Sequence, residues 1–447
     1  MSTVSENRKL TLLVLFTALI LIASYALRAG SNFTGVPALL EMVLGPGEPP
    51  IPDIMSPAQQ VDFWTNRLGP NTQDYITMTH LGQAYLQEAR ETGDAALYQR
   101  AEESFRKALE FNPKYEPAKA LIGSVLIGQH AFADALTFAQ AALATNPDEY
   151  QALAVAGDAN LELGSYPAAE EAYRHLLQKY PGGAIYSRMA RLVWLQGRPD
   201  EAIDWMKKAA DETLALDIGG EELAWYRFQL GELYFNTGDL RNAEKWYHEA
   251  DQAFPGHYLA QSGLGKIEAA RGHLDEAIAR YTTLVARLPQ PNFVAFLGDL
   301  YALQGDTAAA QAQYDTVLFI QQLDVAQQVL YNRQMAVFFA NHALQADTAL
   351  AYAEAELAAR QDIYAYDTLA WALYRAGRYD EARVASDKAL ALGTQDALLF
   401  YHAGMIAAAR GDVAAAREYL GRALDLNPWF DLLQAQTARE TLDGLEG

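Results

Sequence analysis

The sequence predicts an all-α protein, a solenoid of about ten helical hairpins preceded by one transmembrane helix. Pro113, Pro147 and Pro181 end three helical segments at a constant step of 34 residues. Small residues recur at matching offsets within those segments, and a long uncharged run stands near the N-terminus. A fixed period of this length is typical of stacked supersecondary units, each of which buries its apolar face on its neighbours.

Composition sets limits on the class of protein. A chain of 447 residues would ordinarily form about three globular domains, but a repeat array is exempt because its core grows with each unit. The 34 basic and 56 acidic residues give a formal charge of −22, which disfavours a nucleic-acid partner. Cysteine is absent, so disulfides, thiolate metal sites and cysteine nucleophiles are excluded.

Residues 10–27, LTLLVLFTALILIASYAL, carry no charge and are interpreted as a signal-anchor helix. At 1.5 Å per residue this helix spans about 27 Å, close to the hydrocarbon thickness of a bilayer. A cleaved signal peptide is the alternative, because Ser24-Tyr25-Ala26 fits a small-x-small cleavage site. The apolar run, however, exceeds the usual length of about 7–15 residues for the core of a signal peptide.

The charges beside this run predict its orientation. Arg8 and Lys9 precede it and only Arg28 follows closely, so the positive-inside bias favours a single-pass protein whose repeats lie outside the cytoplasm. The margin is only one or two charges, and repeats in the cytoplasm are the alternative. Clustered prolines after the run predict an extended linker. The expected segments are a cytoplasmic N-terminus (1–9), the transmembrane helix (10–27), a Pro-rich juxtamembrane linker (28–55), an N-terminal capping helix (56–74), the solenoid (75–428) and a C-terminal capping helix (429–447).

Units 116–149 and 150–183 show the repeat most plainly. Gly123 and Gly157 stand at the same offset, where the lack of a side chain lets the paired helices approach closely. An aromatic such as Tyr173 fills the space between successive pairs, and proline ends the second helix. Each unit is therefore expected to be a helical hairpin.

These offsets resemble the tetratricopeptide repeat, a 34-residue helix–turn–helix unit. The resemblance covers residues 75–428 and implies a right-handed superhelix. The layout of anchor and repeats looks like the N-terminally membrane-anchored bacterial type of this family. The pattern is clearest in one unit that carries Leu230-Gly231, Tyr234, Ala243, Tyr247, Ala250 and Pro255.

A glycine at the hairpin turns is an independent signal, because a left-handed residue commonly ends a helix. Asp239, Asp306 and Asp412 follow such glycines and are well placed to cap the second helices. The unit 75–115 fits only with both helices lengthened by about a turn. The unit 330–362 is the least regular, since Leu344 replaces its glycine. The turn glycines are Gly164, Gly197, Gly238, Gly272, Gly305, Gly377 and Gly411.

No motif in the sequence points to catalysis. The eight histidines include no pair four residues apart with the glutamate of a zinc-protease helix. The Gly263-Leu-Gly265-Lys266 run lacks the preceding strand and the further glycines of a phosphate loop. Asp-Glu pairs such as Asp200-Glu201 start second helices, where they complement the helix dipole. We therefore expect no enzymatic activity, no cofactor and no metal.

The concave surface remains as the candidate site. In tetratricopeptide proteins it is lined by the first helix of each hairpin and binds extended peptides or a partner helix. The family's offsets mark charged positions at Asp158, Glu162, Glu232, Lys266 and Asp299. Aromatic positions are also marked, although each aromatic could equally be inter-repeat core. The expected partner-binding residues are Arg191, Trp194, Phe235, Phe338, Trp371, Tyr374 and Tyr401.

The sequence thus predicts a membrane-anchored scaffold that binds a protein or peptide partner in its groove and helps assemble or organise a cell-envelope complex. The alternative is a secreted soluble peptide-binding module released by signal cleavage. An enzyme without a recognisable motif is a remote third hypothesis.

Overall fold

The structure is a computed structural model that describes residues 55–69, 73–94, 96–216, 220–327 and 332–446. These residues form 22 α-helices and no strand. The chain divides into two compact units, residues 1–60 and 61–447. The predicted all-α helical repeat solenoid is confirmed.

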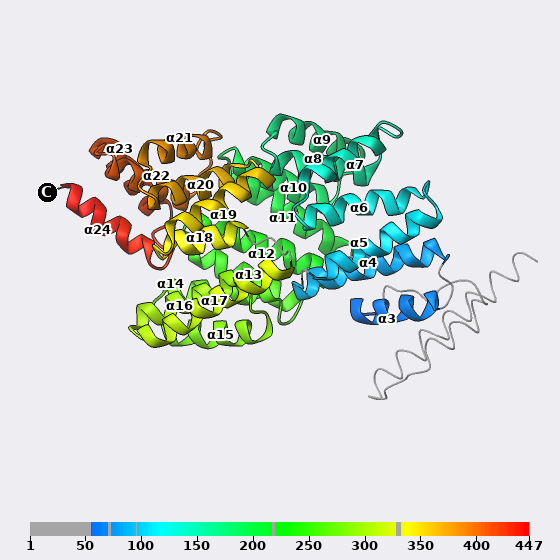
Figure 1. The fold of residues 1–447 in the computed structure, drawn as a ribbon, viewed down its shortest axis with the longest axis horizontal. Helices are drawn as coiled ribbons and strands as arrows, with labels where there is room; N and C mark the ends of the chain where they lie inside the picture. The colour runs from blue at the N-terminus through cyan, green and yellow to red at the C-terminus, as the bar shows by residue number, and fades with distance from the viewer. Residues whose placement is uncertain (1–54, 70–72, 95, 217–219, 328–331, 447) are drawn as a thin grey trace, which may run out of the picture. The chain divides into compact units, whose positions relative to one another are not determined.

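Twenty of these helices pair in chain order as ten hairpins, numbered H1 to H10 below (Figure 1). The helix α3 (Pro57–Leu68) precedes the hairpins, and α24 (Gln434–Glu446) packs against the second helix of H10. The hairpins are α4 (Tyr75–Thr92) with α5 (Ala96–Phe111), α6 (Glu116–Gly128) with α7 (Phe132–Leu143), α8 (Tyr150–Glu162) with α9 (Tyr166–Lys179), α10 (Gly183–Leu195) with α11 (Pro199–Ala215), α12 (Glu221–Asn236) with α13 (Leu240–Ala253), α14 (Tyr258–Ala270) with α15 (Leu274–Arg287), α16 (Pro291–Gln304) with α17 (Thr307–Gln327), α18 (Asn332–Asn341) with α19 (Ala346–Ala359), α20 (Ile363–Arg375) with α21 (Tyr379–Ala389), and α22 (Ala397–Ala409) with α23 (Val413–Leu426).

The membrane-spanning part of the predicted fold is corrected. None of the helices in the described part of the chain is both long and apolar enough to cross a bilayer, which needs roughly 20 apolar residues. The transmembrane helix and the single-pass localisation expected from the sequence are therefore not supported. The run at residues 10–27 itself lies outside the described residues.

The hairpin turns agree with the sequence. All seven predicted turn glycines have positive φ angles, between 73° and 87°. In the irregular unit, Ala343 and Gln345 adopt φ angles of 53° and 39° instead, a conformation that costs a non-glycine residue on the order of 1 kcal/mol. The first hairpin is lengthened as expected, since α4 has 18 residues and α6 only 13.

Glycines inside the first helices accommodate a ring from the second helix. A Cβ atom placed on Gly157, Gly231 or Gly298 would lie 2.3–2.5 Å from a ring carbon of the tyrosine sixteen residues later. No side chain fits there without moving that ring, so the close approach predicted for the paired helices is confirmed.

The aspartates after the turn glycines cap the second helices. Asp239 accepts a hydrogen bond from the backbone N–H of Asn242 at 3.0 Å, and Asp412 accepts one from Ala415 at 3.1 Å. We expect Asp239→Ala to lower the free energy of unfolding by about 1 kcal/mol, because a backbone donor at the start of α13 loses its partner. Urea denaturation measures this loss. Asp239→Asn should keep most of the stability, and equal losses in the two variants would contradict the capping role.

Candidate functional site

Carboxylates on the first helices join successive hairpins. Asp158 on α8 accepts a hydrogen bond from the hydroxyl of Tyr173 on α9 at 2.8 Å. The same carboxylate is 2.8 Å from Nε of Arg188 on α10, in the next hairpin. Burial, together with the charge of Asp158, raises the pKa of Tyr173 well above its usual range. The tyrosine therefore stays protonated and donates to the carboxylate.

The same arrangement recurs along the chain, and we call it the acid–base ladder. In each pair the carboxylate lies on a first helix, and the base lies on or directly after the first helix of the following hairpin. Three of the four carboxylates also accept a hydrogen bond from a tyrosine hydroxyl. The pairs are Asp158 with Arg188 at 2.8 Å, Glu232 with Lys266 at 2.7 Å, Asp299 with His342 at 2.7 Å, and Asp367 with His402 at 2.9 Å.

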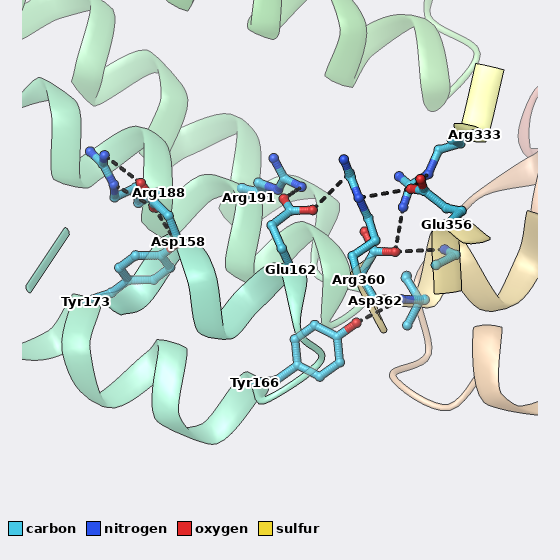
Figure 2. Close-up of polar contacts among 12 residues, drawn as sticks. Asp158, Glu162, Tyr166, Tyr173, Arg188, Arg191, Arg333, Glu356, Arg360 and Asp362 are labelled. Atoms are coloured by element: carbon cyan, nitrogen blue, oxygen red, sulfur yellow. Dashed lines mark hydrogen bonds and ion pairs between the residues drawn. The ribbon is translucent and has the colours of Figure 1, made fainter. Parts of the chain in front are cut away.

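A second group of charges lies beside the ladder and joins α8 of H3 to H8 and to the connection that follows H8 (Figure 2). Glu162, at the end of α8, pairs with Arg191 on α10 and with Nη1 of Arg360 at 3.0 Å. Nε of Arg360 is also 2.9 Å from Glu356. Three carboxylates face three guanidinium groups, so the group is electrically balanced. We call Glu162, Arg191, Arg333, Glu356, Arg360 and Asp362 the charge cluster.

Arg333 completes the charge cluster from α18. Its Nε is 3.0 Å from Glu356 and its Nη2 is 2.7 Å from Asp362. Asp362 also caps α20, because it accepts a hydrogen bond from the backbone N–H of Ala365 at 2.7 Å. Arg333 and Arg360 therefore share the carboxylate of Glu356.

The electrostatics of the charge cluster keep Glu162 ionised. Burial raises the pKa of this carboxyl group, but the neighbouring Arg191 and Arg360 outweigh burial, and the net shift is downward. Burial and the nearby charge of Arg333 lower the pKa of Arg360. Arg360 also lies over the ring of Phe132, with its guanidinium carbon 4.8 Å from the ring centroid. These contacts hold two parts of the chain together by charge, cation–π contact and hydrogen bonds.

Most of the predicted partner-binding residues are buried. Trp194, Phe235, Phe338, Trp371 and Tyr401 are between 1% and 7% exposed. Trp371 donates through Nε1 to Asn341 Oδ1 at 2.8 Å and stacks on His402, with ring centroids 4.3 Å apart, and on Tyr374.

Arg191 and Tyr374 differ from those five. The Arg191 side chain is 51% exposed although it pairs with Glu162. Tyr374 is partly exposed, and its ring lies against the buried Trp371 at 4.7 Å with an angle of 4° between the ring planes. The predicted set therefore divides into a buried aromatic group and two positions that a partner can reach.

Sequence reasoning did not find the second half of the charge cluster. Arg333, Glu356 and Arg360 lie in unit 330–362, the least regular repeat, and Glu162 stands 198 residues before Arg360. No local spacing connects positions so far apart, because the repeat period describes only neighbouring units. Within the described part of the chain, no group of three or more His, Cys, Asp or Glu side chains is arranged to hold a metal ion.

Comparison with known proteins agrees with the repeat. A family model described as tetratricopeptide repeat matches residues 121–184, 262–324 and 368–428, and a second model with the same description matches 226–257. The tetratricopeptide repeats predicted from the sequence are thereby confirmed. The chain thus contains tetratricopeptide repeats over the matched residues. The membrane-anchored bacterial type is not shown.

Two curated proteins are similar over part of the chain. The RNA polymerase-associated protein CTR9 of Caenorhabditis elegans is 38% identical over 77 residues, which are 17% of this chain and 7% of that protein. Tetratricopeptide repeat protein 1 of Schizosaccharomyces pombe is 26% identical over 201 residues, which are 41% of this chain and 19% of that protein. The chain therefore spans less than a fifth of either relative.

Two solved structures show a distant likeness. Cut9, in the crystal structure of the APC/C hetero-tetramer Cut9-Hcn1, is 16% identical with a TM-score of 0.41, covering 87% of this chain and 82% of that chain. Yeast Tom70 is 14% identical with a TM-score of 0.36, covering 89% of this chain and 97% of that chain.

Proposed function

We propose that this chain is a scaffold that binds a protein or peptide partner through the first helices of its hairpins and organises a multiprotein complex. The observation that supports it best is Arg191, which stands half-exposed on the first helix of a confirmed type of repeat. The membrane and cell-envelope setting expected from the sequence depended on the transmembrane helix and is not carried forward.

The contact proposed for the partner has a definite chemistry. A guanidinium group has five N–H donors, and Arg191 uses its Nη2 nitrogen on Glu162. The remaining donors suit a carboxylate or a backbone carbonyl of an extended peptide. Members of the acid–base ladder such as Asp158 and Arg188 are about a quarter exposed and add further polar contacts along the same helices.

Tyr374 supplies a second proposed contact. Its ring is partly exposed and is held flat against Trp371, so little side-chain entropy remains to be lost when a partner packs on it. Trp371 then acts as the support beneath the contact, and truncating it would disturb the core as well as the surface. Tyr374 is therefore the better position for a binding test.

Affinity capture tests the proposed function. We expect Arg191→Ala/Tyr374→Ala to retain partners about thirtyfold more weakly than the wild type, since arginine and tyrosine anchors commonly contribute about 1 kcal/mol each. The readout is the yield of each co-purified protein across a salt series.

A matched double variant controls for surface change. Tyr180→Ala/Arg417→Ala removes an exposed tyrosine and an exposed arginine outside the first helices, and it should retain partners like the wild type. If Arg191→Ala/Tyr374→Ala retains the same proteins at undiminished yield, first-helix binding is wrong.

A further inference from the structure

Hairpins that are far apart in the sequence touch in a regular way. In four places, the turn between the two helices of one hairpin contacts the connection that follows the hairpin five units later. The contacts join H1 to the connection after H6, H3 to the one after H8, H4 to the one after H9, and H5 to the one after H10. We call these four contacts the seam.

Each seam contact includes a hydrogen bond to a backbone carbonyl at or just before a turn. Three of the four contacts use the side chain of a connection residue, and the fourth uses the backbone N–H of Gln361. The bonds are Gln290 Nε2 to Gly93 O at 3.4 Å, Gln361 N to Glu162 O at 2.9 Å, Thr394 Oγ1 to Leu195 O, and Asn427 Nδ2 to Phe235 O at 2.9 Å.

The turn glycines at the seam are in closer contact than those elsewhere. A Cβ atom on Gly164, Gly197 or Gly238 would lie 2.4, 2.2 or 2.7 Å from a backbone oxygen of the facing connection. A Cβ atom on Gly377 or Gly411 would meet nothing within 4 Å. The left-handed turn alone explains why Gly377 and Gly411 are glycines. At the three seam positions, the lack of a side chain also permits a close contact between two backbones.

The charge cluster lies at the seam. Glu162 ends the helix whose turn contacts Gln361, and its carboxylate pairs with the adjacent Arg360 (Figure 2). Beside them the backbone N–H of Ile363 donates to the hydroxyl of Tyr166 at 2.9 Å. Polar groups join the two sides of the seam here, and Ile363, Ala389 and Leu399 also belong to one buried apolar cluster with residues of H3 to H5.

Two other seam contacts involve predicted binding residues. Trp194 on α10 donates to the hydroxyl of Tyr364 on α20 at 3.2 Å. The carbonyl of Phe235 accepts from Asn427, whose side chain is buried. The indole of Trp194 is thus in contact with the other side of the seam, whereas the contact at Phe235 is to its backbone carbonyl.

We infer that the seam is a closed state of the protein that opens without unfolding the hairpins, and that the Glu162–Arg360 pair is its latch. Solenoid repeats are stabilised by nearest neighbours, so the hairpins remain folded when the seam contacts part. A buried ion pair contributes little net stability because desolvation offsets its attraction, yet removing Arg360 leaves three carboxylates facing two guanidinium groups in the charge cluster. Opening uncovers the indole N–H of Trp194 for a partner, a consequence that rests on the proposed function.

Hydrogen exchange of the full-length wild-type protein tests whether the seam opens on its own. The Ile363 amide should exchange through a local opening that has a lower free energy than the opening that exposes the amides inside α8 and α20. Arg360→Met should speed the exchange of Ile363 at least tenfold. Arg188→Met, which breaks an ion pair between adjacent hairpins, should leave the Ile363 rate unchanged. Exchange of Ile363 only together with the helix interiors would overturn the inference.

Distance measurement gives an independent test in a chain that has no cysteine of its own. Spin labels on Glu171→Cys and Val384→Cys, both exposed, report the separation of α9 and α21 across the seam. We expect a longer-distance population in Arg360→Met and Gly197→Ala. Gly411→Ala has the same turn geometry without the seam contact and should match the wild type, as should Arg188→Met.

A label pair within one side of the seam, Glu171→Cys with Asp204→Cys, should keep one distance in every variant. If the two seam variants keep the wild-type distance across the seam, or if the two control variants lengthen it equally, the latch is wrong. Neither experiment needs a bound partner, so failure of the latch and failure of the proposed binding function are distinguished.

Discussion

Tyr247→Ala should lower the free energy of unfolding by about 3–5 kcal/mol, the range for removing a large buried aromatic side chain. Tyr247 on α13 is fully buried. Its ring lies where a Cβ atom on Gly231 or Gly263 would come within 2.5 Å, so it packs on two helices at once. Alanine would leave a cavity that neither glycine can fill. Chemical denaturation followed by circular dichroism measures the loss.

Tyr247→Phe separates packing from hydrogen bonding. It keeps the ring and removes only the hydroxyl, which donates to Glu232 at 2.6 Å. We expect a loss of about 1 kcal/mol, since Glu232 keeps its pairing with Lys266 at 2.7 Å. An alanine variant no less stable than the phenylalanine variant would show that the ring does not hold the hairpins together.

His257 should make the protein less stable as the pH falls below about 6.5. This side chain is fully buried among Phe228, Phe254 and Tyr258, and burial lowers its pKa from 6.5 to about 4. The nearby Asp251 opposes that shift and Arg287 adds to it.

Between these two pKa values the unfolded chain binds a proton that the folded protein does not. The contribution of neutral His257 to stability is therefore complete above pH 6.5 and is lost as the pH falls towards 4, by about 3 kcal/mol in total.

The difference between wild type and His257→Phe isolates this group, because other titrating side chains are common to both. The unfolding free energy of wild type, measured in urea from pH 8 to pH 4, should fall more steeply than that of His257→Phe. His248→Phe, at an exposed histidine on α13, controls for the substitution. Equal pH slopes in wild type and His257→Phe would contradict the buried neutral state.

The repeat architecture could be predicted because its signals are local. Gly231 and Tyr247 lie sixteen residues apart, and their contact is made within one hairpin. Gly411 and Asp412 determine a turn and a cap through their own backbone preferences. The bounds of the segments at either end of the array remain predictions.

The candidate site was less predictable because the family offsets do not specify exposure. Trp371 and Tyr401 stand at groove positions by offset, but their rings are buried in contact with His402 and each other. Arg191 was also marked by offset and is half-exposed. Whether an inward side chain is open to a partner depends on which hairpins lie against it.

The sequence by itself determined the helical hairpin, its turn and its packing on the next unit, because each depends on residues within about one repeat. Only the tertiary structure decided that Glu162 pairs with Arg360 and that Gly197 lies against Gly393. Those contacts join residues almost 200 positions apart, and they depend on the small rotation between successive hairpins accumulated over five units. The residues of one repeat do not reveal the rotation accumulated over five hairpins.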